Sequence, residues 1–148
     1  MIPLSRDHKP DEEDEYKRII ESNGRVDTMY TKSGEAIGPY RVWLKDENIP
    51  GLAMSRSIGD KVASLVGVIS EPEIIEKTLS SEDKFVVIAS DGIWEFLSNE
   101  KVVELVTPFL ESDNPEGACQ KLVDVAVGFW EAEDEVIDDI TVIVTFLA

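Results

Sequence analysis

Two acidic motifs in this sequence stand beside runs of apolar, largely β-branched residues, where the ligands of a metal ion could lie. Asp91 follows the run Phe85–Ala89, and the pair Asp138-Asp139 comes just before the run 140–147. Apolar runs of this length are typical of buried strands, so one acid follows a strand and the other precedes one. If the two strands are antiparallel neighbours, Asp91 and Asp138 meet at one edge of the sheet.

Facing aspartates suit Mg²⁺ or Mn²⁺, which are hard ions that prefer carboxylate, carbonyl and water oxygens. Because Mg²⁺ keeps several of its waters, two carboxylates can form the core of such a site. An Asp-Gly dipeptide such as Asp91-Gly92 is also typical of an ordinary hairpin turn. The apolar run before Asp91 and the second acidic motif favour the metal site.

The residues between the two apolar runs show two helical patterns that must position these acids. Their apolar residues recur at near-helical spacing. Ser98 is predicted to cap the first helix, Pro108 to kink or shorten it, and Pro115 to lie in the opening turn of the second. We expect both apolar runs to be central strands, covered on both faces, with the helices packed on the sheet. The fold class is therefore α+β.

The N-terminal part predicts a short helix followed by short strands. Acids at 11–15 lead into Ile19 and Ile20, and Gly24 follows, which is typical of a helix with a solvated, acidic first turn and a glycine stop. Strands are expected at 26–30 and 40–44. The segments Ser33-Gly34-Glu35 and Gly38-Pro39, which lie between them, are typical of turns.

The composition limits the classes of partner. The chain has 148 residues, 43% of them hydrophobic, which is enough for one globular domain or part of one. Its 14 basic and 31 acidic residues give a formal charge of −17, which argues against nucleic acid or an anionic membrane as a partner. With a single cysteine, Cys119, and no signal-like apolar segment, we expect a cytoplasmic or nuclear protein and a packed thiol.

The motifs together resemble those of the metal-dependent serine/threonine protein phosphatases, the PPM or type 2C family. The resemblance covers roughly residues 4–146 and rests on the segments 85–95 and 51–60, the acidic pair Asp138-Asp139, and the short motifs 7–10 and 24–26. It implies part of a β-sandwich flanked by helices. The family's Asp-Gly-His and Gly-Asp-Ser-Arg motifs do not occur, so residues 1–148 resemble the C-terminal portion of the catalytic domain, with the N-terminal half absent.

The resemblance implies a site for two Mg²⁺ or Mn²⁺ ions in the intact domain, where a metal-activated water attacks the phosphate ester without a phosphoenzyme. By motif position, Asp91 and Asp138 correspond to metal ligands of the family. Glu95 stands where many members have Asp, and its side chain is longer by about 1.5 Å, so a weaker third ion could shift or be lost. Asp139 stands where the family usually has Asn. It either adds charge that raises a neighbour's pKa or is a solvent-facing turn residue.

Arg56 and Asp60 are candidates near the substrate. An arginine there could grip phosphate oxygens, although an internal pair with a carboxylate, holding the loop, is favoured. Residues 61–70 match the family's flap, which influences substrate choice, and ordinary packing is the alternative. The only histidine, His8, is not expected to be a general acid, because the family's proposed proton-transfer histidine belongs to the absent half.

We therefore expect the parent domain to hydrolyse phosphoserine and phosphothreonine in proteins, with this chain supplying part of the metal site and the flap. The isolated chain is expected to have little or no activity. Its expected partners are a phosphoprotein substrate and either the missing N-terminal half or a swapped copy of the chain. The alternative is a non-catalytic, phosphatase-like binding or regulatory module. A calcium sensor is excluded, because the stretch 131–139 lacks the spaced ligands and central glycine of such a loop.

Overall fold

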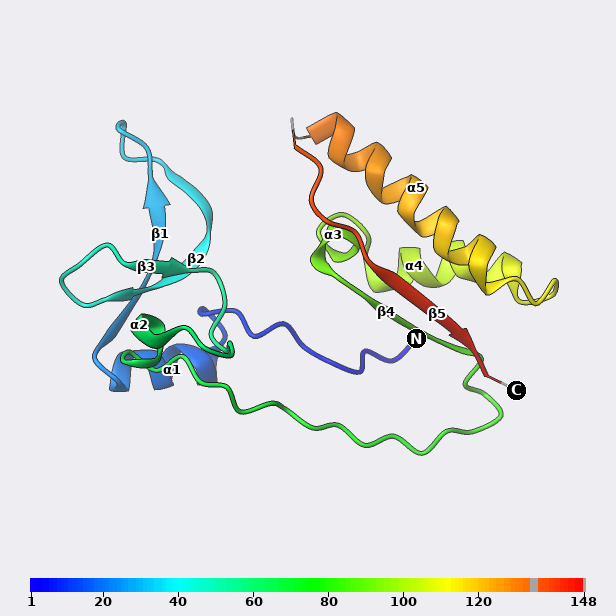
Figure 1. The fold of residues 1–148 in the computed structure, drawn as a ribbon, viewed down its shortest axis with the longest axis horizontal. Coiled ribbons are helices and arrows are strands. Elements are labelled where there is room, and N and C mark those ends of the chain that lie inside the picture. The colour runs from blue at the N-terminus through cyan, green and yellow to red at the C-terminus, as the bar shows by residue number, and fades with distance from the viewer. Residues whose placement is uncertain (134–135, 148) are drawn as a thin grey trace. The chain divides into compact units, whose positions relative to one another are not determined.

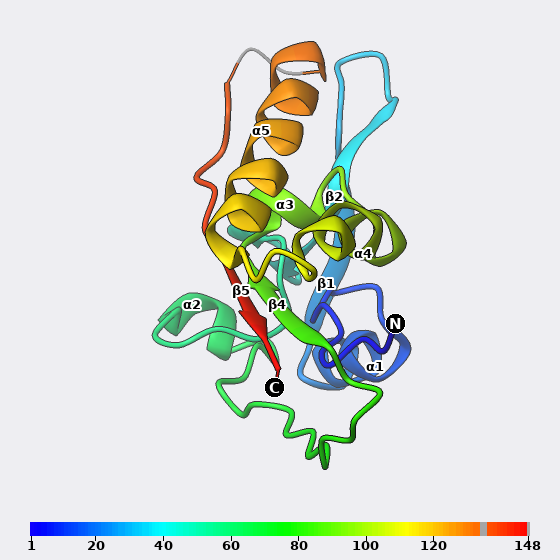
Figure 2. The same cartoon turned by 90° about the vertical axis from the view of Figure 1, so that its right-hand side faces the viewer.

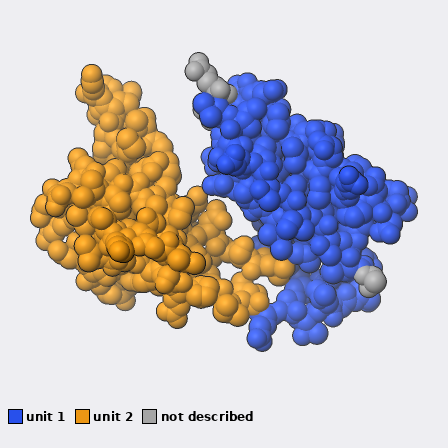
Figure 3. Space-filling view, in the orientation of Figure 1, with its two compact units in different colours: residues 1–3, 76–148 blue, residues 4–75 orange. Residues whose placement is uncertain are grey.

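The computed structural model describes residues 1–133 and 136–147, so residues 134–135 of the acidic stretch lie outside the described part. Residues 4–75 form one compact unit, and residues 1–3 with 76–148 form another (Figure 3). Each unit has its own antiparallel sheet and its own hydrophobic core. Among the described helices, none combines the length and the apolar character needed to cross a bilayer.

The unit 4–75 begins with the predicted helix, α1 (Glu13–Glu21), which has acids in its first turn and ends shortly before Gly24. The expectation that the acids of 11–15 all face solvent is wrong for one residue. Glu15 is 0% exposed, as is Ile19. Residues four apart share one face of a helix, so the face that buries Ile19 also carries Glu15 inward.

Strands β1 (Gly24–Tyr30), β2 (Ala36–Leu44) and β3 (Pro50–Leu52) form the sheet of this unit, in the order β1-β2-β3. The expected turn at Gly38-Pro39 is wrong, because both residues lie within β2. The register of the β1–β2 pair shifts where β1 passes from Asp27 to Met29, and Gly38 has a φ of +72°. An irregularity of this kind lets the strand continue past residues that would otherwise end it.

The core of this unit lies between α1, the sheet and the segment that contains the short helix α2 (Lys61–Ser64). Its buried members are Ile19, Val42, Ala63, Val66 and Val68. The unit therefore closes around side chains from both ends of its sequence.

In the second unit, β4 (Phe85–Ala89) and β5 (Val142–Phe146) pair as antiparallel strands. Between them the chain forms α3 (Asp91–Trp94), α4 (Asn99–Val106), a 3-10 turn (Thr107–Phe109) and α5 (Pro115–Glu133). Helices α4 and α5 lie against one face of the β4–β5 pair (Figures 1 and 2). The predicted strands, helices and α+β class are confirmed in this unit.

The predicted helix boundaries of this unit are also confirmed. The Ser98 side chain caps α4 by accepting a hydrogen bond from the Lys101 N–H at 3.2 Å. Pro108 lies in the 3-10 turn that ends α4, and Pro115 is the first residue of α5. The packed thiol is confirmed as well, because the partly buried Cys119 packs against the core of this unit.

The expectation that β4 and β5 are central strands covered on both faces is wrong for this chain. Within the described residues their sheet has two strands, and the helices cover one face. On the other face, Ile88 lies opposite Ile143, and these side chains are 63% and 54% exposed. The other strands of the described residues pair with one another in the unit 4–75, and none of them flanks β4 or β5.

Candidate metal site

The turn that follows β4 carries the first predicted ligand. The backbone of Ser90 is extended, with φ −75° and ψ 170°, and α3 begins at Asp91. The apolar side chains of β4 favour a strand, and the polar residues Ser90 and Asp91 end it. Asp91 therefore lies at the first position of a helical turn, with an exposed side chain.

The segment before β5 carries the second predicted ligand to the same end of the sheet. Ala89 pairs with Val142, and one residue further on the Ser90 N–H donates to the Thr141 carbonyl at 2.9 Å. The antiparallel pairing predicted from the sequence is thus confirmed. It brings the residues preceding Thr141, including Asp138, to the end of β4 where Asp91 lies.

Backbone contacts bring these two segments close together. A Cβ placed on Gly92 would lie 2.6 Å from the Asp139 carbonyl oxygen, so only glycine fits at this position without a shift. The indole N–H of Trp130 donates to the Gly92 carbonyl at 2.9 Å, and that of Trp94 donates to the Ala89 carbonyl at 2.9 Å. Both tryptophans therefore brace the turn, as expected of packed aromatics with a polar edge.

The four predicted carboxylates are exposed and come from both segments. Glu95 lies one helical turn after Asp91, and its N–H donates to the Asp91 carbonyl at 2.8 Å. Asp138 Oδ1 accepts the Asp139 N–H at 2.8 Å. Nowhere among the described residues do three His, Cys, Asp or Glu side chains gather closely enough to hold a metal ion.

This donor set still suits Mg²⁺ or Mn²⁺. The four predicted ligands at this end of the sheet are carboxylates, the oxygen ligands that these ions prefer. An ion that keeps several waters needs one or two protein carboxylates, and Asp91 and Asp138 could supply them. The remaining ligands must then be waters or groups outside the described residues.

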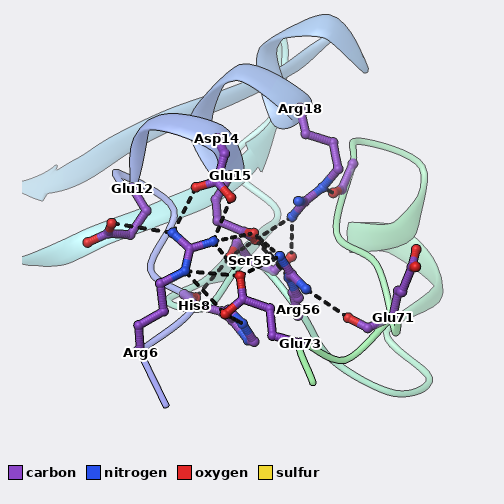
Figure 4. A network of polar contacts seen from close by, with 11 residues as sticks. Arg6, His8, Glu12, Asp14, Glu15, Arg18, Ser55, Arg56, Glu71 and Glu73 are labelled. Atoms are coloured by element: carbon purple, nitrogen blue, oxygen red, sulfur yellow. Dashed lines mark hydrogen bonds and ion pairs between the residues drawn. The ribbon is translucent and has the colours of Figure 1, made fainter. Parts of the chain in front are cut away.

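Arg56 lies in the other unit, in a network around the buried Glu15 (Figure 4). Arg56 Nε and Nη2 donate to Glu15 Oε1 at 3.0 and 2.5 Å, and Arg18 Nη2 donates to Glu15 Oε2 at 2.5 Å. The Ser55 hydroxyl also donates to Glu15. The internal Arg–carboxylate pair that the sequence favoured is therefore confirmed, with Glu15 as the partner.

Burial and hydrogen bonding shift the pKa of Glu15 in opposite directions. Burial by itself would raise the pKa of its carboxyl, but the hydrogen bonds from Arg18, Arg56 and Ser55 stabilise the charged form. The net effect lowers the pKa of Glu15 well below its ordinary value. The signal for this residue in the sequence was its position one turn before Ile19 on the apolar face of the helix.

Arg6 extends the same network to a second acidic group. Its guanidinium binds Asp14 through two hydrogen bonds, of 2.8 and 2.5 Å, and donates from Nε to Glu73 Oε1 at 3.0 Å. The hydrogen bonds from Arg6 lower the pKa of Asp14 to about 2 and also lower the pKa of Glu73. His8 Nε2 lies 3.4 Å from Glu73 Oε2, so His8 lies beside this network.

Asp60 and the predicted flap line a hollow of about 380 Å³ in the unit 4–75. Asp60 occupies the N-cap position of α2, and its side chain makes no capping hydrogen bond. The hollow is lined by Ser57, Gly59, Asp60, Ser64, Val68, Ile69, Ser70 and Glu71. Residues of the flap segment thus border a polar cavity.

Comparison with known proteins decides the family. The family model described as Protein phosphatase 2C matches residues 1–129. The chain belongs to the protein phosphatase 2C family. The resemblance that the motifs indicated is thereby confirmed, and it extends over most of the sequence.

Protein phosphatase 2C relatives from plants match nearly the whole chain. The probable protein phosphatase 2C 48 of Oryza sativa subsp. japonica is 38% identical over 147 residues, covering 98% of the chain and 40% of the relative. The probable protein phosphatase 2C 72 of Arabidopsis thaliana is 39% identical over 148 residues, covering 99% and 43%. The chain therefore spans about two fifths of the length of these relatives.

Solved structures show the protein phosphatase 2C fold. A serine-threonine phosphatase 2C from Toxoplasma gondii superposes with a TM-score of 0.81 at 22% identity, covering 98% of the chain and 46% of that protein. A C. elegans sex determining protein superposes with a TM-score of 0.71 at 24% identity, covering 98% and 32%. The chain has the fold of one portion of these larger proteins.

Proposed function

We propose that this chain supplies Asp91 and Asp138 to the Mg²⁺ or Mn²⁺ site of a phosphatase that hydrolyses phosphoserine and phosphothreonine in proteins. Family membership supports phosphatase chemistry. The observation that carries the residue assignment is the register of β4 and β5, which brings the segment of Asp138 to the end of β4 where Asp91 lies. Glu95 and Asp139 are further candidates at the same place.

In this proposal the two aspartates hold the ions, and their backbone segments fix where the ions lie. When bound, such ions would supply an activated water and neutralise charge on the phosphate ester. Asp91 contributes its carboxylate from the first turn of α3, and Asp138 contributes its own from the segment before β5. Arg56 holds its loop through Glu15 instead of binding phosphate, and the flap residues around Asp60 line the hollow where a substrate segment could lie.

Calorimetric titration with Mn²⁺ tests the residue assignment. We expect wild type to bind the ion. Asp91→Asn and Asp138→Asn should each lose that binding, because each substitution removes a carboxylate charge and keeps the shape of the side chain. Asp124→Asn makes the same change on the exposed face of α5 and should leave the isotherm unchanged. Equal isotherms for wild type, Asp91→Asn and Asp138→Asn would contradict the assignment.

Hydrolysis itself is expected to require more than this chain. The described residues do not bring three metal ligands together, and the chain spans about two fifths of its relatives. With Mn²⁺ and an aryl phosphate we expect little or no turnover, and recovery when the N-terminal half of a relative is added. Strong turnover by the chain alone would refute the need for that half.

A second chain is the partner we propose for the uncovered face of β4 and β5, either the missing half or a swapped copy. Ile88 and Ile143 are exposed on that face. In addition, the edges of a two-stranded sheet readily recruit another strand. Light scattering at high protein concentration should then show dimers or larger species. A monodisperse monomer under those conditions would count against the swapped copy.

The formal charge of −17 favours a second candidate function, a non-catalytic module that keeps the fold. In such a module the acidic surface would serve recognition. The same calorimetry separates the two candidates, because a module without a metal site gives identical isotherms for wild type and Asp91→Asn.

A further inference from the structure

We propose that Ser90 is a positioning residue that fixes the acids of the metal site relative to one another. The inference rests on the proposed function, because it concerns the same acids. Ser90 does not bind the metal itself. It holds together the two backbone segments from which Asp91 and Asp138 project.

The hydroxyl of Ser90 is used in an unusual way for its position. Ser90 is the N-cap residue of α3, where a serine side chain ordinarily accepts a hydrogen bond from its own helix. Here it makes no such bond. Instead, its Oγ accepts the Thr141 N–H at 3.0 Å and donates to the Asp139 carbonyl at 3.1 Å, so both its donor and an acceptor position are used across the sheet.

These two bonds extend the pairing of the strands beyond the sheet. The last ladder pair is Ala89 with Val142, followed by the bond from the Ser90 N–H to the Thr141 carbonyl. The described residues from 136 to 141 belong to no strand. The Ser90 hydroxyl therefore restrains this irregular segment at Asp139.

A continuous path of contacts joins the two predicted ligands through this hydroxyl. Asp91 is the next residue after Ser90 in the chain. The Ser90 hydroxyl binds the Asp139 carbonyl, and the Asp139 N–H in turn donates to Asp138 Oδ1 at 2.8 Å. The backbone at Gly92 lies close to the same carbonyl, so the restrained segment has little room to move toward α3.

Because the partners of the Ser90 hydroxyl are exposed to solvent, the effect of Ser90 on the position of the ligands can be distinguished from an effect on the stability of the fold. Asp139 and Thr141 are exposed, so water can replace the hydrogen bonds that Ser90→Ala removes. The variant should therefore remain folded, with a small change in its unfolding midpoint. What it loses is the restraint on the segment that carries Asp138. Removal of groups that orient metal ligands typically weakens metal binding by about 10-fold to 100-fold.

Calorimetric titration of the full chain with Mn²⁺, at the same pH for each variant, tests this role. We expect Ser90→Ala to bind Mn²⁺ about 10-fold more weakly than wild type, and Ser90→Thr to stay close to wild type because it keeps the hydroxyl. The matched control is Ser98→Ala, which removes the cap of α4 in the same unit and should leave the affinity for Mn²⁺ unchanged. Hydrogen exchange of the Thr141 amide should become faster in Ser90→Ala and remain slow in Ser98→Ala.

The outcomes distinguish this inference from the proposed function. If wild type binds Mn²⁺ through Asp91 and Ser90→Ala binds it equally well, the positioning role is refuted and the metal site stands. If Ser90→Ala and Ser98→Ala weaken binding equally, Ser90 has a general structural role and the inference is also refuted. If wild-type binding is absent or does not depend on Asp91, the proposed metal site itself fails, and the role of Ser90 fails with it.

Discussion

Replacing the buried Glu15 by Gln tests whether its ion pairs hold the unit 4–75 together. The substitution keeps the shape of the side chain and removes the charge that Arg18 and Arg56 both contact. The Glu15 side chain is 0% exposed, whereas those of Arg18 and Arg56 are 24% and 14% exposed. The variant therefore leaves two guanidinium groups without their carboxylate partner in a largely buried site.

The expected cost follows from this burial. Breaking a fully buried ion pair typically destabilises a protein by about 3–5 kcal/mol. Both arginines retain some contact with water, and the Gln carbonyl still accepts a hydrogen bond, so we expect a smaller loss of about 2–3 kcal/mol. Because Gln cannot ionise, the advantage of wild type should also depend on pH.

The assay is hydrogen exchange of the α1 and β1 amides across a urea series, because two compact units need not unfold as one. Glu13→Gln is the control, since Glu13 lies in the same first turn and is exposed. Equal protection in Glu15→Gln and Glu13→Gln would refute the reasoning.

The pH dependence gives a second check on the same pair. The native pKa of Glu15 is lowered, so its contribution is fully present above the ordinary carboxyl value of about 4.3 and is lost as pH falls toward the native pKa. The difference in stability between wild type and Glu15→Gln should therefore shrink as the solution is acidified below that value. A difference that stays constant or grows on acidification would contradict the assignment.

Three further substitutions have equally specific expected results. Gly92→Ala places a Cβ 2.6 Å from the Asp139 carbonyl oxygen and should destabilise the unit that contains residues 76–148 by about 1–3 kcal/mol. Gly128→Ala, on α5 with nothing within 4 Å, should stabilise the same unit by about 1 kcal/mol. Thermal melts of the two variants measure both effects. Arg6→Ala removes the hydrogen bonds that hold the pKa of Asp14 at about 2, so NMR titration should show that pKa rising to an ordinary aspartate value, and no rise would contradict the pairing.

Much of the unit that contains residues 76–148 could be predicted from the sequence, because the signals there are local. A serine before an apolar helical pattern caps it, a proline ends or opens a helix, and β-branched runs form strands. Ser98, Pro108 and Pro115 all lie where these rules place them. The antiparallel pairing of the two runs then brought Asp91 and Asp138 to one end of the sheet.

The features that only the tertiary structure decided depend on what lies beside a residue in space. Glu15 belongs to an acidic stretch that looks solvated, yet its burial becomes favourable through Arg18, one turn later on the same helix, and Arg56, which is distant in the sequence. The sequence shows that β4 and β5 are apolar but not what covers each face of their sheet. One face proved to be exposed at Ile88 and Ile143. Spacing likewise does not indicate that the Ser90 hydroxyl turns away from its own helix, because its partners lie about 50 residues further along the chain.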